Sequence, residues 1–143
     1  HHEGCDVLFT TEAPLGQVAN VDREGFALAQ RVVKFRGLPN VLNNYYLKYW
    51  LMSDAVQSTL STLATGSTAE GIKASKLGQI PLAVPPLSEQ DEIVEFLDER
   101  RVAIDVAKAH VIEHISRLRE YRSSLISAAV TGQLDVSNYE VAA

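Results

Sequence analysis

The sequence predicts an α+β fold in which a mixed α/β head is followed by one long helix that forms a coiled coil. Two observations lead to this prediction. The first forty residues alternate short apolar runs with turn residues, as half-buried strands do, whereas residues 89–130 contain neither Gly nor Pro. The composition, 46% hydrophobic and 22% charged over 143 residues, is that of a globular chain and excludes a disordered or collagen-like one.

Three strands are expected in the head, at residues 6–10, 17–21 and 26–35. A Pro and a Gly within residues 11–16 mark the loop between the first two. Because side chains alternate along a strand, the third run places Lys34 and Arg36 on the face opposite to its apolar residues. One face of this sheet is therefore expected to be core and the other wet and basic.

An amphipathic helix is expected next, with Asn40 as its N-cap and its end near residue 65. Its apolar residues recur in steps of three or four: Tyr45, Tyr49, Met52, Val56, Leu60 and Leu63. Residues 80–86 follow with a Pro near both ends, so a strand there would be short or at a sheet edge.

The long helix is expected over residues 89–130, with Ser88 and Asp91 forming a capping box at its start. At about 1.5 Å per residue it would be roughly 63 Å long. A row of apolar residues seven apart, joined by Ile115, predicts a coiled-coil or subunit interface. Its members are Leu97, Ile104, Val111, Ile115, Leu118 and Leu125. We expect the isolated chain to pair through this row as a homodimer.

Charge and cysteine content narrow the function. The net charge is −5, from 13 basic and 18 acidic residues, which argues against a protein that holds nucleic acid by bulk positive charge. Residues 22–53 are locally basic, with five basic residues against two acidic ones.

The single Cys5 excludes an internal disulfide and a cysteine-built zinc cage. No apolar run reaches 18 residues, so no membrane span or secretion signal is expected, and the expected compartment is the cytoplasm.

Two stretches imitate catalytic motifs. Residues 110–114 fit H-x-x-E-H, which carries two zinc ligands in one class of protease. However, His110 and His114 lie in the stretch of the helix that carries the heptad row, and only 29 residues follow that could supply a third zinc ligand. Residues 66–73 resemble a phosphate-binding loop but have Ile72 where Lys must follow the second Gly. No catalytic residue, metal or cofactor is therefore expected, although a zinc hydrolase stays open as an alternative.

Binding is a better interpretation than chemistry for the basic residues and the polar loop. Basic side chains and loop hydroxyls can both contact phosphates, although a solvated sheet face and an ordinary loop would look the same. The candidate DNA-binding residues are Arg31, Lys34, Arg36, Ser67, Thr68 and Lys73. The aromatic residues that cluster on the first helix are expected to be core and not a base-stacking platform.

Several stretches together resemble the specificity subunit of type I restriction-modification systems. They are residues 6–16 (DVLFTTEAPLG), 28–33 (LAQRVV), 65–68 (TGST), 71–73 (GIK), 80–90 (IPLAVPPLSEQ) and 120–132 (EYRSSLISAAVTG). The combination of PPLSEQ with a long helix that ends in YRSSLISAAVTG is the most specific part of this resemblance.

The resemblance implies a non-enzymatic reader of double-stranded DNA. Such subunits carry two target recognition domains separated by long antiparallel helices, which modification and restriction subunits hold. The modification subunits methylate adenine with S-adenosylmethionine, and the restriction subunits add ATP-driven translocation and cleavage. Residues 1–87 would then be a partial target recognition domain whose start is missing, residues 88–132 one spacer helix and residues 133–143 a C-terminal tail. The rival interpretation is a coiled-coil dimerisation module with a protein-binding head.

Overall fold

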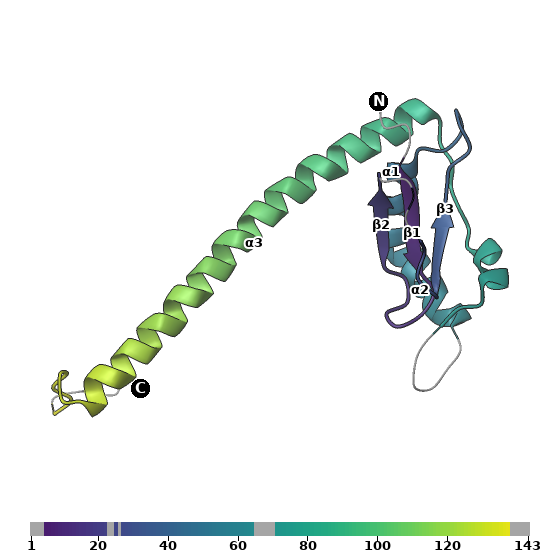
Figure 1. Ribbon diagram of the computed structural model, residues 1–143. Coiled ribbons are helices and arrows are strands. Elements are labelled where there is room, and N and C mark those ends of the chain that lie inside the picture. The colour runs from purple at the N-terminus through teal and green to yellow at the C-terminus, as the bar shows by residue number, and fades with distance from the viewer. Residues whose placement is uncertain (1–4, 23–24, 26, 65–70, 138–143) are drawn as a thin grey trace. The chain divides into compact units, whose positions relative to one another are not determined.

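The computed structural model of the protein describes residues 5–22, 25, 27–64 and 71–137 (Figure 1). The chain divides into two compact units, residues 1–97 and residues 98–143. The first unit contains a three-stranded sheet, its helices and the first turns of the long helix α3 (Leu87–Val130). The predicted α+β class is confirmed.

The sheet is antiparallel, with the order β2-β1-β3. The central strand β1 (Asp6–Thr10) has the predicted bounds, and β2 (Val18–Val21) begins one residue later than predicted. The third strand was predicted too long, since β3 covers only Val32–Phe35. Arg31 has a left-handed backbone with φ of 70°, and its carbonyl oxygen accepts from Thr11 N at 2.8 Å. This turn directly precedes β3, so residues 27–31 are not part of the strand.

Two helices replace the single helix that was predicted over the following residues. They are α1 (Asn44–Met52) and α2 (Asp54–Leu63). Ser53 lies between them with an extended backbone, and its hydroxyl accepts from Val56 N at 3.5 Å, so it caps the second helix. The apolar spacing of the sequence continues across Ser53, but this residue caps a new helix. The segment therefore forms two helices and not one.

The predicted N-cap, Asn40, was also wrong. Asn40 has a φ of 60° within a turn, and Asn43 caps α1 by accepting from the amides of residues 45 and 46. The turn is tight at Gly37, where an added Cβ would lie 2.1 Å from the carbonyl oxygen of Leu42. The chain thus closes a compact loop before the helix begins.

The core lies between one face of the sheet and the two helices. Phe9 of β1 packs edge-on against Phe35 of β3, with ring centroids 5.9 Å apart. Four aromatic residues of the first helix, Tyr45, Tyr46, Tyr49 and Trp50, were expected to be core. Tyr46 is buried as expected, whereas the other three are only partly buried, with Trp50 packed against the core. The buried cluster consists of Val7, Phe9, Leu47, Leu51, Val56, Leu60 and Ile72.

The segment after α2 leads to the long helix. A short 3-10 helix, η1 (Ala74–Gln79), is followed by residues 81–86, which join no strand and form the linker that precedes α3. α3 begins at Leu87, so Ser88 lies inside its first turn and does not cap it as predicted. The helix ends at Val130, and Gly132 follows with a φ of 73°, a conformation that suits glycine at a helix C-terminus.

We expect Leu60→Ala to lower the free energy of unfolding by about 2–5 kcal/mol, because it removes a side chain that is only 1% exposed and leaves a cavity in the core. The matched control is Leu38→Ala, in a side chain that is 69% exposed, which should change stability by less than about 0.5 kcal/mol. Urea unfolding followed by circular dichroism measures both. Equal effects of the two substitutions would contradict this description of the core.

Candidate nucleic-acid interface

The first group of basic residues surrounds Asp6 at the start of β1. Arg36 donates two hydrogen bonds to the Asp6 carboxylate, from Nε at 2.5 Å and from Nη2 at 2.9 Å. Lys34 Nζ lies 3.0 Å from the same carboxylate. We call these three residues the Asp6 cluster. They share the sheet face opposite to Val7 and Phe9, so the predicted separation of a basic face from a core face is confirmed for Lys34 and Arg36.

Electrostatics keep the Asp6 cluster charged. The hydrogen bond from Arg36, with that from Lys34, lowers the pKa of Asp6 from 3.8 to about 2. Asp6 is only 7% exposed, whereas the side chains of Lys34 and Arg36 are 44% and 63% exposed. Two cations facing one carboxylate leave the cluster with a net charge of +1 at neutral pH.

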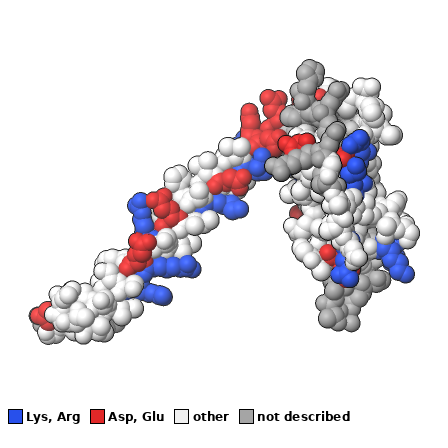
Figure 2. Space-filling view, viewed as in Figure 1, with Lys and Arg blue, Asp and Glu red and all other residues white. Residues whose placement is uncertain are grey.

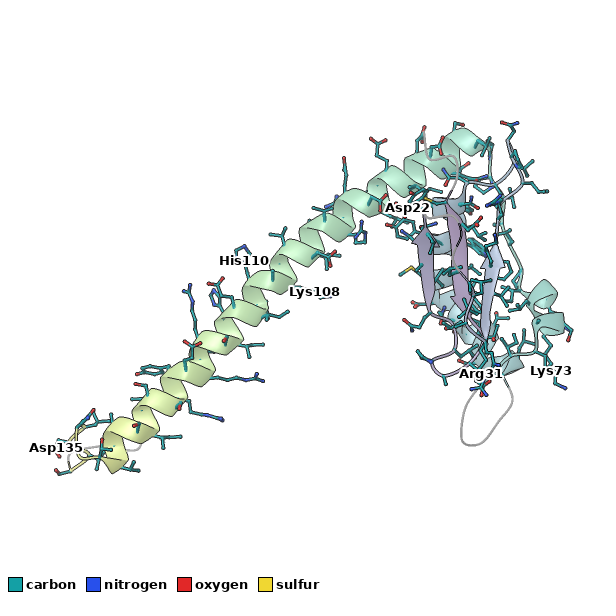
Figure 3. The ribbon with its side chains drawn as sticks, viewed as in Figure 1. Asp22, Arg31, Lys73, Lys108, His110 and Asp135 are labelled. Atoms are coloured by element: carbon teal, nitrogen blue, oxygen red, sulfur yellow. The ribbon has the colours of Figure 1, made fainter. Side chains whose placement is uncertain are left out.

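Arg31 lies at the other end of β1. Its Nε is 2.9 Å from a carboxylate oxygen of Glu12. Thr11, the residue after β1, connects this turn to the segment that carries Lys73, because its amide donates to Arg31 O and its carbonyl accepts from Ile72 N at 2.9 Å. Figure 3 shows Arg31 and Lys73 at the same end of the sheet.

The predicted site residues therefore form two groups. One group consists of Arg31 and Lys73, which lie at the same end of the sheet (Figure 3). The other group is the Asp6 cluster. Ser67 and Thr68 lie outside the described residues. The acidic partners Asp6 and Glu12 were not recognised from the sequence, although Asp6 begins the first strand run and Glu12 follows it. Their pairing with basic residues 19 to 30 positions away depends on the strand register, which local sequence patterns do not determine.

The apolar row of α3 is exposed from Ile104 onward. Ile104, Val111 and Leu118 are each more than half exposed, with Leu118 at 66%. Leu97 is partly buried. Charged side chains of both signs lie along the same helix (Figure 2), and several pair within it, as Arg117 does with Glu113 at 2.6 Å. In the described part of the second unit, nothing covers this row.

The motif at residues 110–114 lies on the same exposed helix, where Figure 3 labels His110. Among the described residues, no group of three or more His, Cys, Asp or Glu side chains is arranged to hold a metal ion. None of the helices in the described ranges combines the length and hydropathy needed to cross a bilayer.

Comparison with known proteins supplies the family. A family model described as "Type I restriction modification DNA specificity domain" matches residues 1–116, which include the head and most of α3. The chain belongs to this family. The resemblance stated from its motifs is thereby confirmed.

Curated relatives point the same way. The chain is 29% identical over 89 residues to the type I restriction enzyme StySPI specificity subunit of Salmonella potsdam and 28% identical over 89 residues to the EcoKI specificity subunit of Escherichia coli K12. Each match covers 62% of this chain and 19% of the relative. The EcoBI specificity subunit of Escherichia coli is 29% identical over 107 residues, or 75% of this chain and 22% of the relative. The chain thus spans about a fifth of the length of these relatives.

We expect acid to weaken the Asp6 cluster in a defined range. Because the pKa of Asp6 is lower in the folded chain than its ordinary value of 3.8, its ion pairs stabilise the fold above about pH 4, and this contribution is lost as the pH falls through about 2. Asp6→Asn should remove this part of the pH dependence. The measurement is the free energy of unfolding from pH 6 to about 2 by urea titration.

Arg36→Gln is the control for the cause of the lowered pKa. It removes the main donor to Asp6, so the acid-induced loss of stability should become smaller than in the unsubstituted chain. An unchanged pH slope in both variants would contradict the assignment.

Proposed function

We propose that this chain recognises double-stranded DNA as part of the specificity subunit of a cytoplasmic type I restriction-modification complex. The family match over residues 1–116 is the observation that carries the proposal. The relatives of which it resembles a part are themselves named as specificity subunits of type I restriction enzymes. Within this proposal residues 1–87 are the partial recognition domain, residues 88–132 the spacer helix and residues 133–143 the tail.

The basic groups of the head are the proposed phosphate contacts. Lys34 and Arg36 keep a net positive charge after pairing with Asp6, and this charge favours the approach of a phosphate to the exposed side of the cluster. Arg31 and Lys73 are the other proposed phosphate contacts of the head. The proposal also includes Ser67 and Thr68, which precede Lys73 in the sequence. Phosphates are the same at every base pair. These contacts would therefore position the head on the duplex without reading its base sequence.

The exposed row of α3 is the proposed binding surface for another helix and for the modification and restriction subunits. Large apolar side chains spaced by heptads form a continuous contact when a second helix packs against them. The isolated chain would use the same row to form an antiparallel homodimer. The chain itself catalyses nothing in this proposal and holds no cofactor; the modification subunit methylates adenine with S-adenosylmethionine.

One observation favours the alternative of a dimerisation module with a protein-binding head. Each of the basic residues Arg31, Lys34 and Arg36 already faces a carboxylate, so the head has less free positive charge than the sequence suggests. The two proposals differ in their dependence on salt, because only phosphate binding releases the counterions of DNA.

Replacement of both Lys34 and Arg36 by Gln should weaken binding to duplex DNA and reduce the slope of log K against log salt by about 0.9 for each phosphate that the variant no longer binds. The matched control is Arg117→Gln with Arg119→Gln on α3, which removes the same charge from the proposed spacer. Fluorescence anisotropy with a labelled duplex over a salt series measures both. A larger loss of affinity in the control pair would overturn the assignment of the basic groups, and binding insensitive to salt would favour the protein-binding alternative.

Leu118→Asp should dissociate the homodimer of the isolated chain, because a carboxylate in the centre of the helix contact would be buried without a partner. Ser123→Asp is the control, since residue 123 lies two positions before the row member Leu125 and on the outer side of the heptad. Sedimentation velocity at micromolar concentration gives the outcome. A monomeric unsubstituted chain with α3 still folded would contradict the proposed pairing.

A further inference from the structure

A completely buried amide lies at the start of α3. Gln90 has no exposed surface, although glutamine is mostly found at protein surfaces. Its Nε2 donates to Val41 O at 2.9 Å and to Pro85 O at 2.7 Å, and its Oε1 accepts from Asn43 N at 2.8 Å. One side chain thus binds three backbone groups, from the loop before α1 and from the linker before α3.

Two aromatic side chains of α1 hold the rest of that linker. Trp50 Nε1 donates to Pro81 O at 2.9 Å, and Tyr46 Oη donates to Ala83 O at 3.0 Å. Together with Gln90, they bind the carbonyl oxygens of residues 81, 83 and 85. Alternate residues of an extended segment present their carbonyls to the same side, so three side chains can bind the linker in one row. Tyr46 and Trp50 stack with centroids 6.3 Å apart, which fixes the spacing of the two donors.

The linker suits this arrangement because three of its positions are proline. Proline has no N–H, so the carbonyl oxygens at these positions are the only backbone hydrogen-bonding groups that can anchor the segment. Burial raises the pKa of Tyr46, with a further contribution from Glu89, so the hydroxyl remains a donor at neutral pH. Asn43 joins both ends of the arrangement, because it caps α1 and its Nδ2 donates to Asp91 at 2.6 Å.

We propose that Gln90, with Tyr46, Trp50 and Asn43, forms a rigid joint that fixes the direction of the first turns of α3 relative to the sheet. All of these residues belong to the first compact unit. The geometry assigns Gln90 a positioning role: it touches no proposed DNA contact, yet it holds the element that follows the head. The consequence for DNA rests on the proposed function, since a specificity subunit must hold its recognition domains at a defined separation.

The test is a distance measurement by pulsed electron paramagnetic resonance in the full chain. Spin labels are placed at Ala19→Cys on β2 and Glu95→Cys on α3, with Cys5→Ser, and the labelled chain is diluted with unlabelled chain so that only distances within one molecule are recorded. The unsubstituted joint should give one narrow distance. Gln90→Glu preserves the shape and the acceptor for Asn43 but removes both donors, so the narrow distance should be lost in molecules that circular dichroism shows to be folded.

Gln57→Glu is the matched control. Gln57 Nε2 also donates to two carbonyl oxygens, those of Gly16 and Leu51, but both lie within the head. This control should lower thermal stability and leave the distance narrow. Tyr46→Phe provides a second variant that removes one hydroxyl from the joint, and it should broaden the distance less than Gln90→Glu. If Gln90→Glu does not fold, Tyr46→Phe decides.

Three results would overturn the joint. They are a narrow distance in folded Gln90→Glu, a narrow distance in Tyr46→Phe where Gln90→Glu does not fold, and equal broadening in Gln57→Glu. A second readout uses the chain assembled with its modification subunit on DNA targets whose two half-sites differ in separation by one base pair. The preference of the assembly for one separation should decrease in Gln90→Glu. Failure of the unsubstituted assembly to bind DNA would contradict the proposed function, whereas the distance measurement would still decide the joint.

Discussion

The arrangement of the head around the start of α3 depends on the burial of one amide group. A buried amide that lacks partners is costly, by about 1–3 kcal/mol for each unsatisfied group, so Gln90 is stable in the interior only where both of its polar atoms are bonded. The three backbone groups that meet this requirement come from Val41, Asn43 and Pro85. Because these partners are up to 49 residues from Gln90 in sequence, one side chain constrains two loops and the long helix together.

A second constraint governs the charged residues of the head. Asp6 and Glu12 face basic side chains that would otherwise attract any polyanion, and the whole chain is negative. Pairing holds Arg36 in a fixed orientation and lowers the charge available for unspecific attraction. If the chain reads DNA as proposed, its affinity depends less on net positive charge and more on the geometry of its contacts, because weak nonspecific binding leaves more of the discrimination to contacts with the correct site.

Local patterns were sufficient for some elements and insufficient for others. The bounds of β1 and the C-terminal end of α3 followed from alternation and from the absence of Gly and Pro, which act within a few residues, whereas α3 begins two residues before its predicted start. The division at Ser53 did not, because the apolar spacing continues across it, and the extended backbone of Ser53 together with its capping hydroxyl separates the two helices. The short β3 and the buried Gln90 depend on contacts with residues far away in sequence. The PPLSEQ stretch was recognised as a motif, but the physical reason for its final residue required the structure.

The two ends of α3 differ in what stabilises them. Its first turns contain the buried residues Gln90 and Val94, whereas the row from Ile104 onward faces solvent. Pairs within the helix, such as Arg117 with Glu113, contribute only about 0.2–0.5 kcal/mol each, and most helices in proteins are stabilised by packing of an apolar face. The head therefore supplies packing for the N-terminal end of α3, and in the proposed assembly the second unit gains its main stabilisation when the partner covers the row. Under the proposed function, folding of the distal part of α3 and binding of the partner are for this reason coupled equilibria.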